Sequence, residues 1–291
     1  PGASFNTEVD SLPEAREIEK QQRDTWERFS AGWIKWDPQV VEMLAPVGQE
    51  MIRLLALADD GVHLDIASGT GEPGLSIATQ MPKGRVVLTD LSEAMLVGAR
   101  SKAEKQAIGN VEVRVCGVDD LPFEDASFDS VSCRFGFMFF PDIRGAVSEL
   151  VRMARPGGRI STAVWAEPDG NAWATIPMGA ISAEVTLAPP ERDAPGLFRC
   201  AAQDSIAAIF REAGLHDVAE SDVRGSLEVD SGDEYWSLLT DVTAPIVAVL
   251  AGVDDATRNR IRAMTIENAQ AFDNDGKLTL PYHARCIVGT R

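Results

Sequence analysis

A glycine-rich turn between a short apolar stretch and a helix-like stretch constrains the fold of this chain more than any other feature. The segment VHLDIASGTGEPGLSIA runs from Val62 to Ala78. Its glycines Gly69, Gly71 and Gly74 fit the spacing G-x-G-x-x-G. This spacing is typical of a turn that leads from a parallel strand into a helix and approaches a ligand closely. The segment therefore predicts the first strand–helix unit of an open α/β sheet, with a ligand at the carboxyl end of the strand.

Strand-like and helix-like segments alternate along the chain after this turn. We expect strands at 62–66, 85–89, 111–116, 129–135 and 160–165, and helices at 74–81, 93–106 and 143–154. Strands that alternate with helices of this length form βαβ units and a parallel sheet. The sequence thus predicts an α/β fold with a doubly wound sheet.

The remaining segments divide the chain into a core and cap elements. Residues 1–58 predict N-terminal helices that act as a lid or cap, and 233–277 predict a helical cap insertion. The Rossmann-like core is expected at 59–232 and 278–291. Within it, 167–200 are rich in Pro, Ala and Gly and predict an excursion of loops and short helix.

Composition narrows the classes of partner. The formal net charge is −18, so the surface repels phosphate backbones and nucleic acid is not an expected partner. The sequence holds no apolar run of about 18 residues and no basic, apolar leader. Four scattered cysteines and three histidines give no metal-binding pattern. We expect a cytoplasmic protein without a membrane span or a metal, acting on a small molecule.

Three carboxylates at the ends of three successive strands bear on the nature of the ligand. Asp65 lies within the first strand, Asp90 ends the second and Asp119 follows the third. No Lys-Ser or Lys-Thr follows the glycines, which rejects a P-loop. A nicotinamide dinucleotide remains an alternative, because Asp90 lies 19 residues after Gly71. Asp65, however, would repel its diphosphate.

S-adenosylmethionine fits the three carboxylates better, because it is cationic at its methionine end and has no phosphate. Asp65 suits the ammonium and sulfonium groups. Asp90 can accept hydrogen bonds from both ribose hydroxyls, and Asp119 from the adenine amine.

These segments resemble the successive motifs of the class I S-adenosylmethionine-dependent methyltransferases. LDIASGTGEPGLSIA, VVLTDLSEAML, GVDDLPFEDASFDSVSC and RPGGR carry the resemblance over about residues 60–165. It is nearest to the small-molecule group that includes the ubiquinone/menaquinone C-methyltransferases. It implies a seven-stranded sheet whose last strand is antiparallel, and the cofactor S-adenosylmethionine, with S-adenosylhomocysteine as product. The cofactor contacts that it implies are Asp65, Ala67, Ser68, Gly69, Gly71, Asp90, Leu91, Met95, Val118, Asp119 and Arg134.

The acceptor of the methyl group is expected beyond strands four and five. Aromatic residues follow strand four in RFGFMFFPD, where they either pack the next helix or form an apolar wall for an aromatic or lipid-like acceptor. Two tryptophans in GWIKWDP either pack or form a lid. The candidate pocket residues are Trp33, Trp36, Phe135, Phe137, Met138 and Phe139.

His283 is the candidate general base. It opens the final strand, and the start of an antiparallel last strand lies at the ligand end of the sheet. It is therefore the only histidine placed to reach a substrate. Methyl transfer needs a base only where the nucleophile cannot shed its proton alone.

Three functions follow from these observations. The first is an enzyme that transfers a methyl group from S-adenosylmethionine to oxygen, nitrogen or carbon of a small apolar or aromatic acceptor by in-line displacement. The alternatives are an NAD(P)-dependent oxidoreductase and a non-catalytic S-adenosylmethionine-binding protein. A homo-oligomer is compatible with the N-terminal helices closing over a neighbouring subunit.

Overall fold

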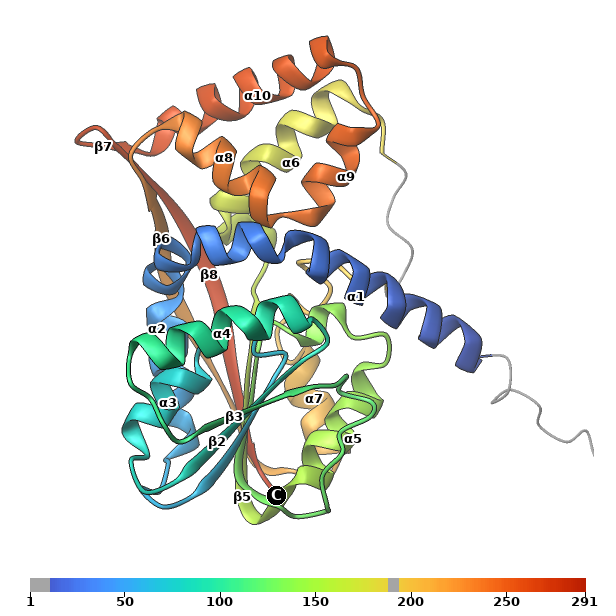
Figure 1. The fold of residues 1–291 in the computed structure, drawn as a ribbon. Coiled ribbons are helices and arrows are strands. Elements are labelled where there is room, and N and C mark those ends of the chain that lie inside the picture. The colour runs from blue at the N-terminus through green and yellow to red at the C-terminus, as the bar shows by residue number, and fades with distance from the viewer. Residues whose placement is uncertain (1–10, 188–193) are drawn as a thin grey trace, which may run out of the picture.

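A central twisted sheet carries helices on both faces and a group of helices beyond one of its ends (Figure 1). The computed structural model describes residues 11–187 and 194–291, with side chains described from Glu17 onward. Residues 1–10 of the expected lid and 188–193 of the expected excursion lie outside the described residues. The predicted α/β fold class is confirmed.

The sheet follows the strand order β3-β2-β1-β4-β5-β8-β6. β8 is antiparallel to both β5 and β6, whereas the other pairs along this path are parallel. The seven strands with an antiparallel last strand agree with the prediction, and a two-residue strand, β7, pairs with β8 as an eighth. The strands are β1 (Val62–Ile66), β2 (Arg85–Asp90), β3 (Val111–Val115), β4 (Phe128–Arg134), β5 (Ala154–Trp165), β6 (His216–Val229), β7 (Asp273–Asn274) and β8 (Lys277–Thr290).

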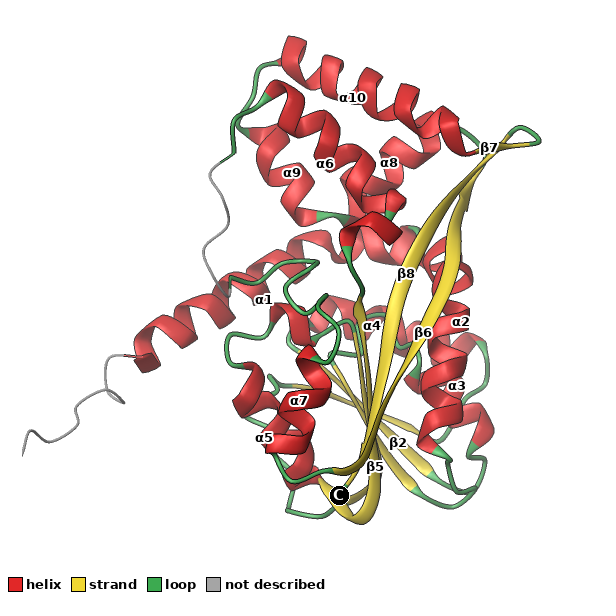
Figure 2. Cartoon of the chain, turned by 180° about the vertical axis from the view of Figure 1, so that it is seen from behind, coloured by secondary structure: helices red, strands yellow, loops and turns green. Residues whose placement is uncertain are grey.

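Two sets of helices cover the sheet faces. The first set is α2 (Asp37–Leu55), α3 (Gly74–Gln80) and α4 (Glu93–Lys105), and the second is α5 (Ile143–Met153) and α7 (Ser205–Glu212) (Figure 2). α2 packs against β5, β6 and β8, and its Val47 and Met51 are fully buried. This helix was expected in a lid over residues 1–58, but its apolar face covers the sheet instead.

The helical cap is built from two separate segments of the chain. It contains α6 (Ala172–Glu184), α8 (Gly232–Val242), α9 (Ala244–Ala251) and α10 (Asp255–Ala269), and α10 packs against both α6 and α8. α6 belongs to the expected excursion at 167–200, so the cap extends beyond the expected insertion at 233–277. Pro245 stands in the first turn of α9, where its missing N–H leaves no helical bond unmade.

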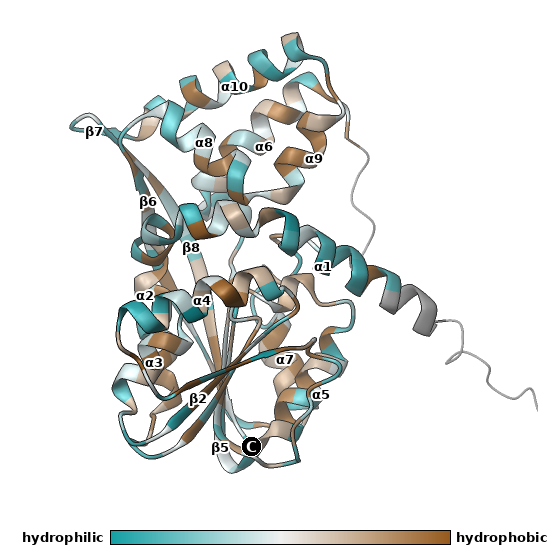
Figure 3. Ribbon diagram, viewed as in Figure 1, coloured by the Kyte–Doolittle hydropathy of each residue, from teal (hydrophilic) through white to brown (hydrophobic). Residues whose placement is uncertain are grey.

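Helix α1 (Ser11–Lys35) lies between the cap and the sheet and passes across the ligand end of the strands (Figure 1). Its outward surface is hydrophilic (Figure 3). Gly32 meets the backbone of Asp241 in α8 so closely that an added Cβ would clash with its carbonyl oxygen. The Asp241 carboxylate also accepts from Lys35 Nζ at 2.7 Å and from Trp36 Nε1 at 2.8 Å. α1 is thereby fixed to the cap.

None of the helices in the described part of the chain combines the length and the apolar character that crossing a bilayer requires.

Candidate active site

One cavity of about 600 Å³ joins the ends of the strands to the cap. Its walls come from the turn after β1, the ends of β2, β4 and β5, helix α1, and helices α8 and α9. In an open α/β sheet, ligands bind beyond the carboxyl ends of the strands. Its volume is within the usual range for small-molecule sites.

The glycine turn forms the floor of the cavity beside β1. Gly69 and Gly71 have positive φ angles of 52° and 106°, and Ala67 has φ 53°. The N–H of Gly71 donates to the carbonyl of Ser68 at 2.8 Å, which closes the turn. The φ of Gly71 favours glycine, and an added Cβ would also lie 2.7 Å from Leu75 Cδ1 of α3. Gly71 is not part of the cavity wall.

Asp65 stabilises the glycine turn through hydrogen bonds and is not part of the cavity wall. It is fully buried, its Oδ2 accepts from Gly74 N–H at 3.1 Å and its Oδ1 accepts from Ser132 Oγ at 2.5 Å. Burial raises the pKa of this carboxyl to about 7, against the opposing effects of Ser132, Arg134 and Gly74. The structure thus gives Asp65 contacts to the protein, where sequence reasoning expected contacts to the cationic end of the cofactor.

Asp90 ends β2 and lines the cavity. Its Oδ2 accepts from Gly69 N–H at 2.8 Å, and its Oδ1 accepts from Ser92 N–H at 2.9 Å. Each carboxylate oxygen keeps capacity for a second hydrogen bond. Burial raises the pKa of Asp90 to about 6, although the two backbone donors favour the charged form. The carboxylate is therefore fixed in direction and can accept hydroxyl groups from the cavity.

A second carboxylate, Asp119, meets the same cavity beyond β3. It is exposed and lies beside Gly117, where an added Cβ would be 2.5 Å from Asp119 Oδ1. Met95 is 3% exposed and lines the same part of the cavity together with Val118. Two of the three strand-end carboxylates, Asp90 and Asp119, therefore face one cavity.

Arg134 brings a cation to the wall at the end of β4. Burial lowers its pKa, and the nearby carboxylates of Glu72 and Asp65 oppose that shift. Lys102 lies 3.5 Å from Glu72 and 3.1 Å from Asp37. This cluster of charges includes Glu72 of the turn itself.

Nine of the predicted cofactor residues share the cavity wall. They are Ala67, Ser68, Gly69, Asp90, Leu91, Met95, Val118, Asp119 and Arg134. Apart from Trp33, the residues that α1 adds to the same wall were not predicted as site residues, among them Glu19, Thr25 and Trp26. These residues belong to a polar helix that contains no recognisable motif. The spacing of its aromatic residues is the one sequence pattern that indicates a buried face on this helix.

The side of the cavity where an acceptor is expected is aromatic. Phe135 stacks on Trp165 with ring centroids 4.2 Å apart and planes 17° from parallel. Phe135 has φ 60°, a conformation that a bulky side chain rarely adopts outside functional sites. Phe139 meets Trp26 edge to face at 5.2 Å. The other predicted pocket residues on this wall are Trp33 and Met138.

Two predicted pocket residues lie elsewhere. Phe137, in the 3-10 helix η1 (Phe137–Phe139), is fully buried and packs edge to face with Phe140 and Phe210. Trp36 is 7% exposed and its indole N–H is bound to Asp241. Phe137 therefore belongs to the core and Trp36 to the junction between α1 and α8, because neighbouring side chains of a helical turn face different directions.

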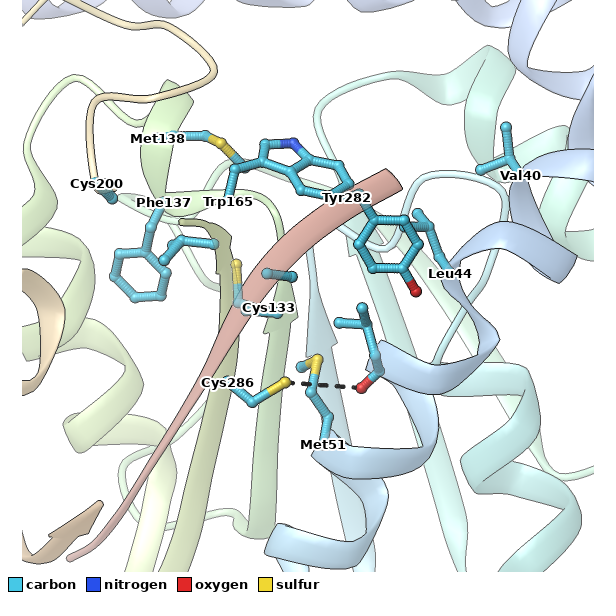
Figure 4. Close-up of a cluster of buried hydrophobic side chains, with 14 of the residues drawn as sticks. Val40, Leu44, Met51, Cys133, Phe137, Met138, Trp165, Cys200, Tyr282 and Cys286 are labelled. Atoms are coloured by element: carbon cyan, nitrogen blue, oxygen red, sulfur yellow. Dashed lines mark hydrogen bonds between the residues drawn. The ribbon is translucent and has the colours of Figure 1, made fainter. Parts of the chain in front are cut away.

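His283 also lies outside the cavity wall. Its Nε2 is 3.0 Å from Asp222 Oδ1, and the residue is 7% exposed. Neighbouring side chains of a strand point to opposite faces. Tyr282 turns toward α2 (Figure 4). Its hydroxyl donates to the carbonyl of Met43 at 2.8 Å. His283 lies beside the carboxyl end of β5, as expected, but it does not open the last strand, which begins at Lys277, and its side chain contacts Asp222 of β6 and not the site.

The strand order, the antiparallel last strand and the glycine turn beside a strand-end carboxylate are those expected of a class I S-adenosylmethionine-dependent methyltransferase domain. Residues 64–158 match the family model described as "Methyltransferase domain". The resemblance predicted from the motifs is confirmed over this segment.

Known proteins support this assignment at two levels. The demethylmenaquinone methyltransferase of Thermus thermophilus is 38% identical over 115 residues, which are 39% of this chain and 51% of the relative. The chain spans about half the length of the curated relatives it matches. A putative methyltransferase from Bacillus halodurans has the same fold, with TM-score 0.52 and 19% identity over 84% of this chain and 97% of that one. The [4+2]-cyclase SpnF is similar too, with TM-score 0.52 and 15% identity over 89% and 93%.

Proposed function

We propose that this protein transfers the methyl group of S-adenosylmethionine to oxygen, nitrogen or carbon of a small, apolar or aromatic acceptor. The single observation that carries the proposal is the composition of one cavity. Asp90 and Asp119 line this cavity, and so does the stacked pair Phe135 and Trp165. A cofactor on the carboxylates and an apolar acceptor against the rings would therefore share one enclosed space.

The cofactor contacts follow from the chemistry of these groups. Asp90 would accept the ribose hydroxyls, because charge-assisted hydrogen bonds to a fixed carboxylate are strong. Asp119 would accept from the adenine amine, and Met95 would pack against the ring. Arg134 offers a cation for the carboxylate of the methionine end, and the backbone of Ala67 to Gly69 lines the path between these groups.

The reaction proposed is an in-line displacement at the methyl carbon. The sulfonium makes this carbon electrophilic, so the protein has to hold the nucleophile close and aligned. Such positioning is worth up to about 7–11 kcal/mol. The stacked rings of Phe135 and Trp165 give a flat, rigid surface for this purpose. His283 has no part in the proposal, since its imidazole lies against Asp222.

A small molecule suits this cavity better than nucleic acid. The net charge is −18, and α1 carries Glu19 and Asp24 on the wall. These charges repel a phosphate backbone.

The test is transfer of a labelled methyl group. The full chain is incubated with S-adenosylmethionine bearing a ¹³C-labelled methyl group and a panel of phenols, quinones, amines and indoles. The expected result is an acceptor that gains one labelled methyl by mass, with inhibition by S-adenosylhomocysteine. Asp90→Ala should lower the rate at subsaturating cofactor, whereas Asp120→Ala, one residue from the wall, should not.

Two other results would favour the alternatives. If S-adenosylhomocysteine binds but no methyl group is transferred to any of these acceptors, the result would support a non-catalytic S-adenosylmethionine-binding protein or an enzyme that catalyses another reaction on the same fold. Binding of NAD(H) in preference to S-adenosylhomocysteine would overturn the assignment of the cofactor.

A further inference from the structure

The acceptor wall contributed by β5, α6, α8 and α9 contains only uncharged side chains among the described residues. The charged groups on the wall come from α1, the glycine turn, the ends of β2 and β4, and the segment after β3. An anionic or cationic group of a ligand would find no counter-ion on this wall. A buried unpaired charge is costly, so the wall selects an uncharged part of the acceptor.

Several aromatic side chains around this wall have internal partners for their polar groups, whereas the buried indole N–H of Trp33 has none among the described residues. Trp173 Nε1 donates to Asn171 Oδ1 at 3.3 Å, and Tyr282 and Trp36 donate to Met43 and Asp241. The indole N–H of Trp165 bonds to none of the described residues, although the residue is only 5% exposed and lines the cavity. Figure 4 shows its nitrogen on the ring edge directed away from the core.

The position of this N–H is fixed by packing. The Trp165 ring is stacked on Phe135, lies 4.9 Å from Trp173, and meets Tyr282 edge to face at 5.8 Å. A phenylalanine would stack equally well, whereas a buried indole N–H usually finds a partner. An N–H held at the cavity in an apolar wall is therefore available to donate to a ligand atom.

We propose that Trp165 Nε1–H donates to an uncharged oxygen of the methyl acceptor, a carbonyl or hydroxyl oxygen on an apolar or aromatic body. The proposal rests on the proposed function for the identity of this cavity as the acceptor site. Trp165 is then a specificity-determining residue, because it distinguishes an oxygenated ring from the corresponding hydrocarbon. Thr243, a 7% exposed residue between α8 and α9, brings a further uncharged polar side chain to this wall.

The experiment compares two probes that differ by one oxygen. Dissociation constants of 1-tetralone and tetralin are measured by tryptophan fluorescence on the full chain saturated with S-adenosylhomocysteine, and again without it. The same measurements are made on Trp165→Phe and on Trp236→Phe, a matched control whose ring lies outside the cavity wall. Comparing the ratio of the two constants between the wild type and a variant cancels the difference in solvation between the probes.

The expected result is a preference for 1-tetralone that falls about fivefold in Trp165→Phe, the size of one net hydrogen bond. Tetralin affinity should stay the same, and Trp236→Phe should keep the wild-type ratio. An unchanged ratio in Trp165→Phe, or no binding of either probe to the wild type, overturns the proposal.

A measurement on the wild type keeps the test valid if Trp165→Phe fails to fold. In the ¹⁵N-labelled chain, 1-tetralone should move the Trp165 indole N–H resonance downfield and tetralin should not. Equal shifts with both probes overturn the proposal. Failure of the proposed function gives a different result. The chain would then not bind S-adenosylhomocysteine or not transfer a methyl group, although Trp165 would still respond to the tetralone oxygen.

Discussion

The Asp90 carboxylate accepts a hydrogen bond from the backbone N–H of Gly69 at 2.8 Å, and this bond joins the end of β2 to the glycine turn after β1. The turn can approach the carboxylate because Gly69 adopts φ 52° without a side chain in the way. The same carboxylate lines the cavity, so the shape of the turn and the charge of the site depend on one group.

Cofactor binding should therefore depend on the protonation of Asp90. Burial raises its pKa to about 6, and ribose hydroxyls donate to the ionised form. S-adenosylhomocysteine should bind more tightly as pH rises from about 5 to about 8, by at most about tenfold per pH unit below the pKa. Calorimetry over this pH range measures the affinity, and buffers of different ionisation enthalpy detect the released proton. Asp90→Asn should bind weakly with a flatter profile. An affinity that falls as pH rises would contradict this role.

Asp65 should make the ligand-free protein less stable as pH rises. Its folded-state pKa, about 7, is above the ordinary value of 3.8, so the folded state binds more protons than the unfolded state. The stabilisation is fully present below the unfolded pKa and is lost as pH rises through the folded pKa. The free energy of unfolding of Asp65→Asn, relative to that of the wild type, should therefore be higher at about pH 8 than at about pH 5. Urea unfolding at both pH values measures this, and a difference of opposite sign would show that Asp65 is charged in the folded protein.

The two aspartates after β3 form a matched pair for testing the adenine edge. Asp119 lines the cavity, whereas its exposed neighbour Asp120 does not. Asp119→Asn should weaken S-adenosylhomocysteine binding about five- to tenfold, the effect of one hydrogen bond to a charged group partly exposed to water. Asp120→Asn removes the same charge and should leave the affinity within about twofold. An equal loss of S-adenosylhomocysteine affinity in both variants would mean that Asp119 acts through its negative charge and not through a hydrogen bond to the ligand.

The sequence allowed the parallel part of the sheet and most of the cofactor wall to be predicted, because both depend on local patterns. The glycine spacing and the strand-end position of Asp90 locate the wall without knowledge of distant contacts. The prediction that Asp65 contacts the cofactor was wrong, because its oxygens accept hydrogen bonds from Ser132 in β4, 67 residues away, and from Gly74. That pairing depends on strand register, which a single motif does not contain.

The acceptor side was harder to predict because its walls come from segments far apart in the chain. α1 meets α8 through Gly32 and Asp241, which lie more than 200 residues apart. Phe137 and Phe139 stand two residues apart in an aromatic run, yet only Phe139 reaches the cavity, since the turn of η1 separates their directions. His283 was placed at the correct end of the sheet, but the face toward which its side chain points follows from pairing with β6.

The contact between α1 and the cap should be required for acceptor binding. A methyl group at Gly32 would clash with the carbonyl of Asp241, which should displace α1 and destabilise the protein by about 1–3 kcal/mol. Gly32→Ala should also lower the affinity for an apolar probe such as 1-tetralone several-fold, because Trp33 on the wall moves with the helix. Gly179→Ala is the matched control, since an added Cβ in α6 meets nothing within 4 Å and alanine favours a helix by about 1 kcal/mol. Thermal unfolding and probe titration of both variants measure these effects. A Gly32→Ala protein with wild-type stability and probe affinity would show that α1 adapts its position without loss of the site.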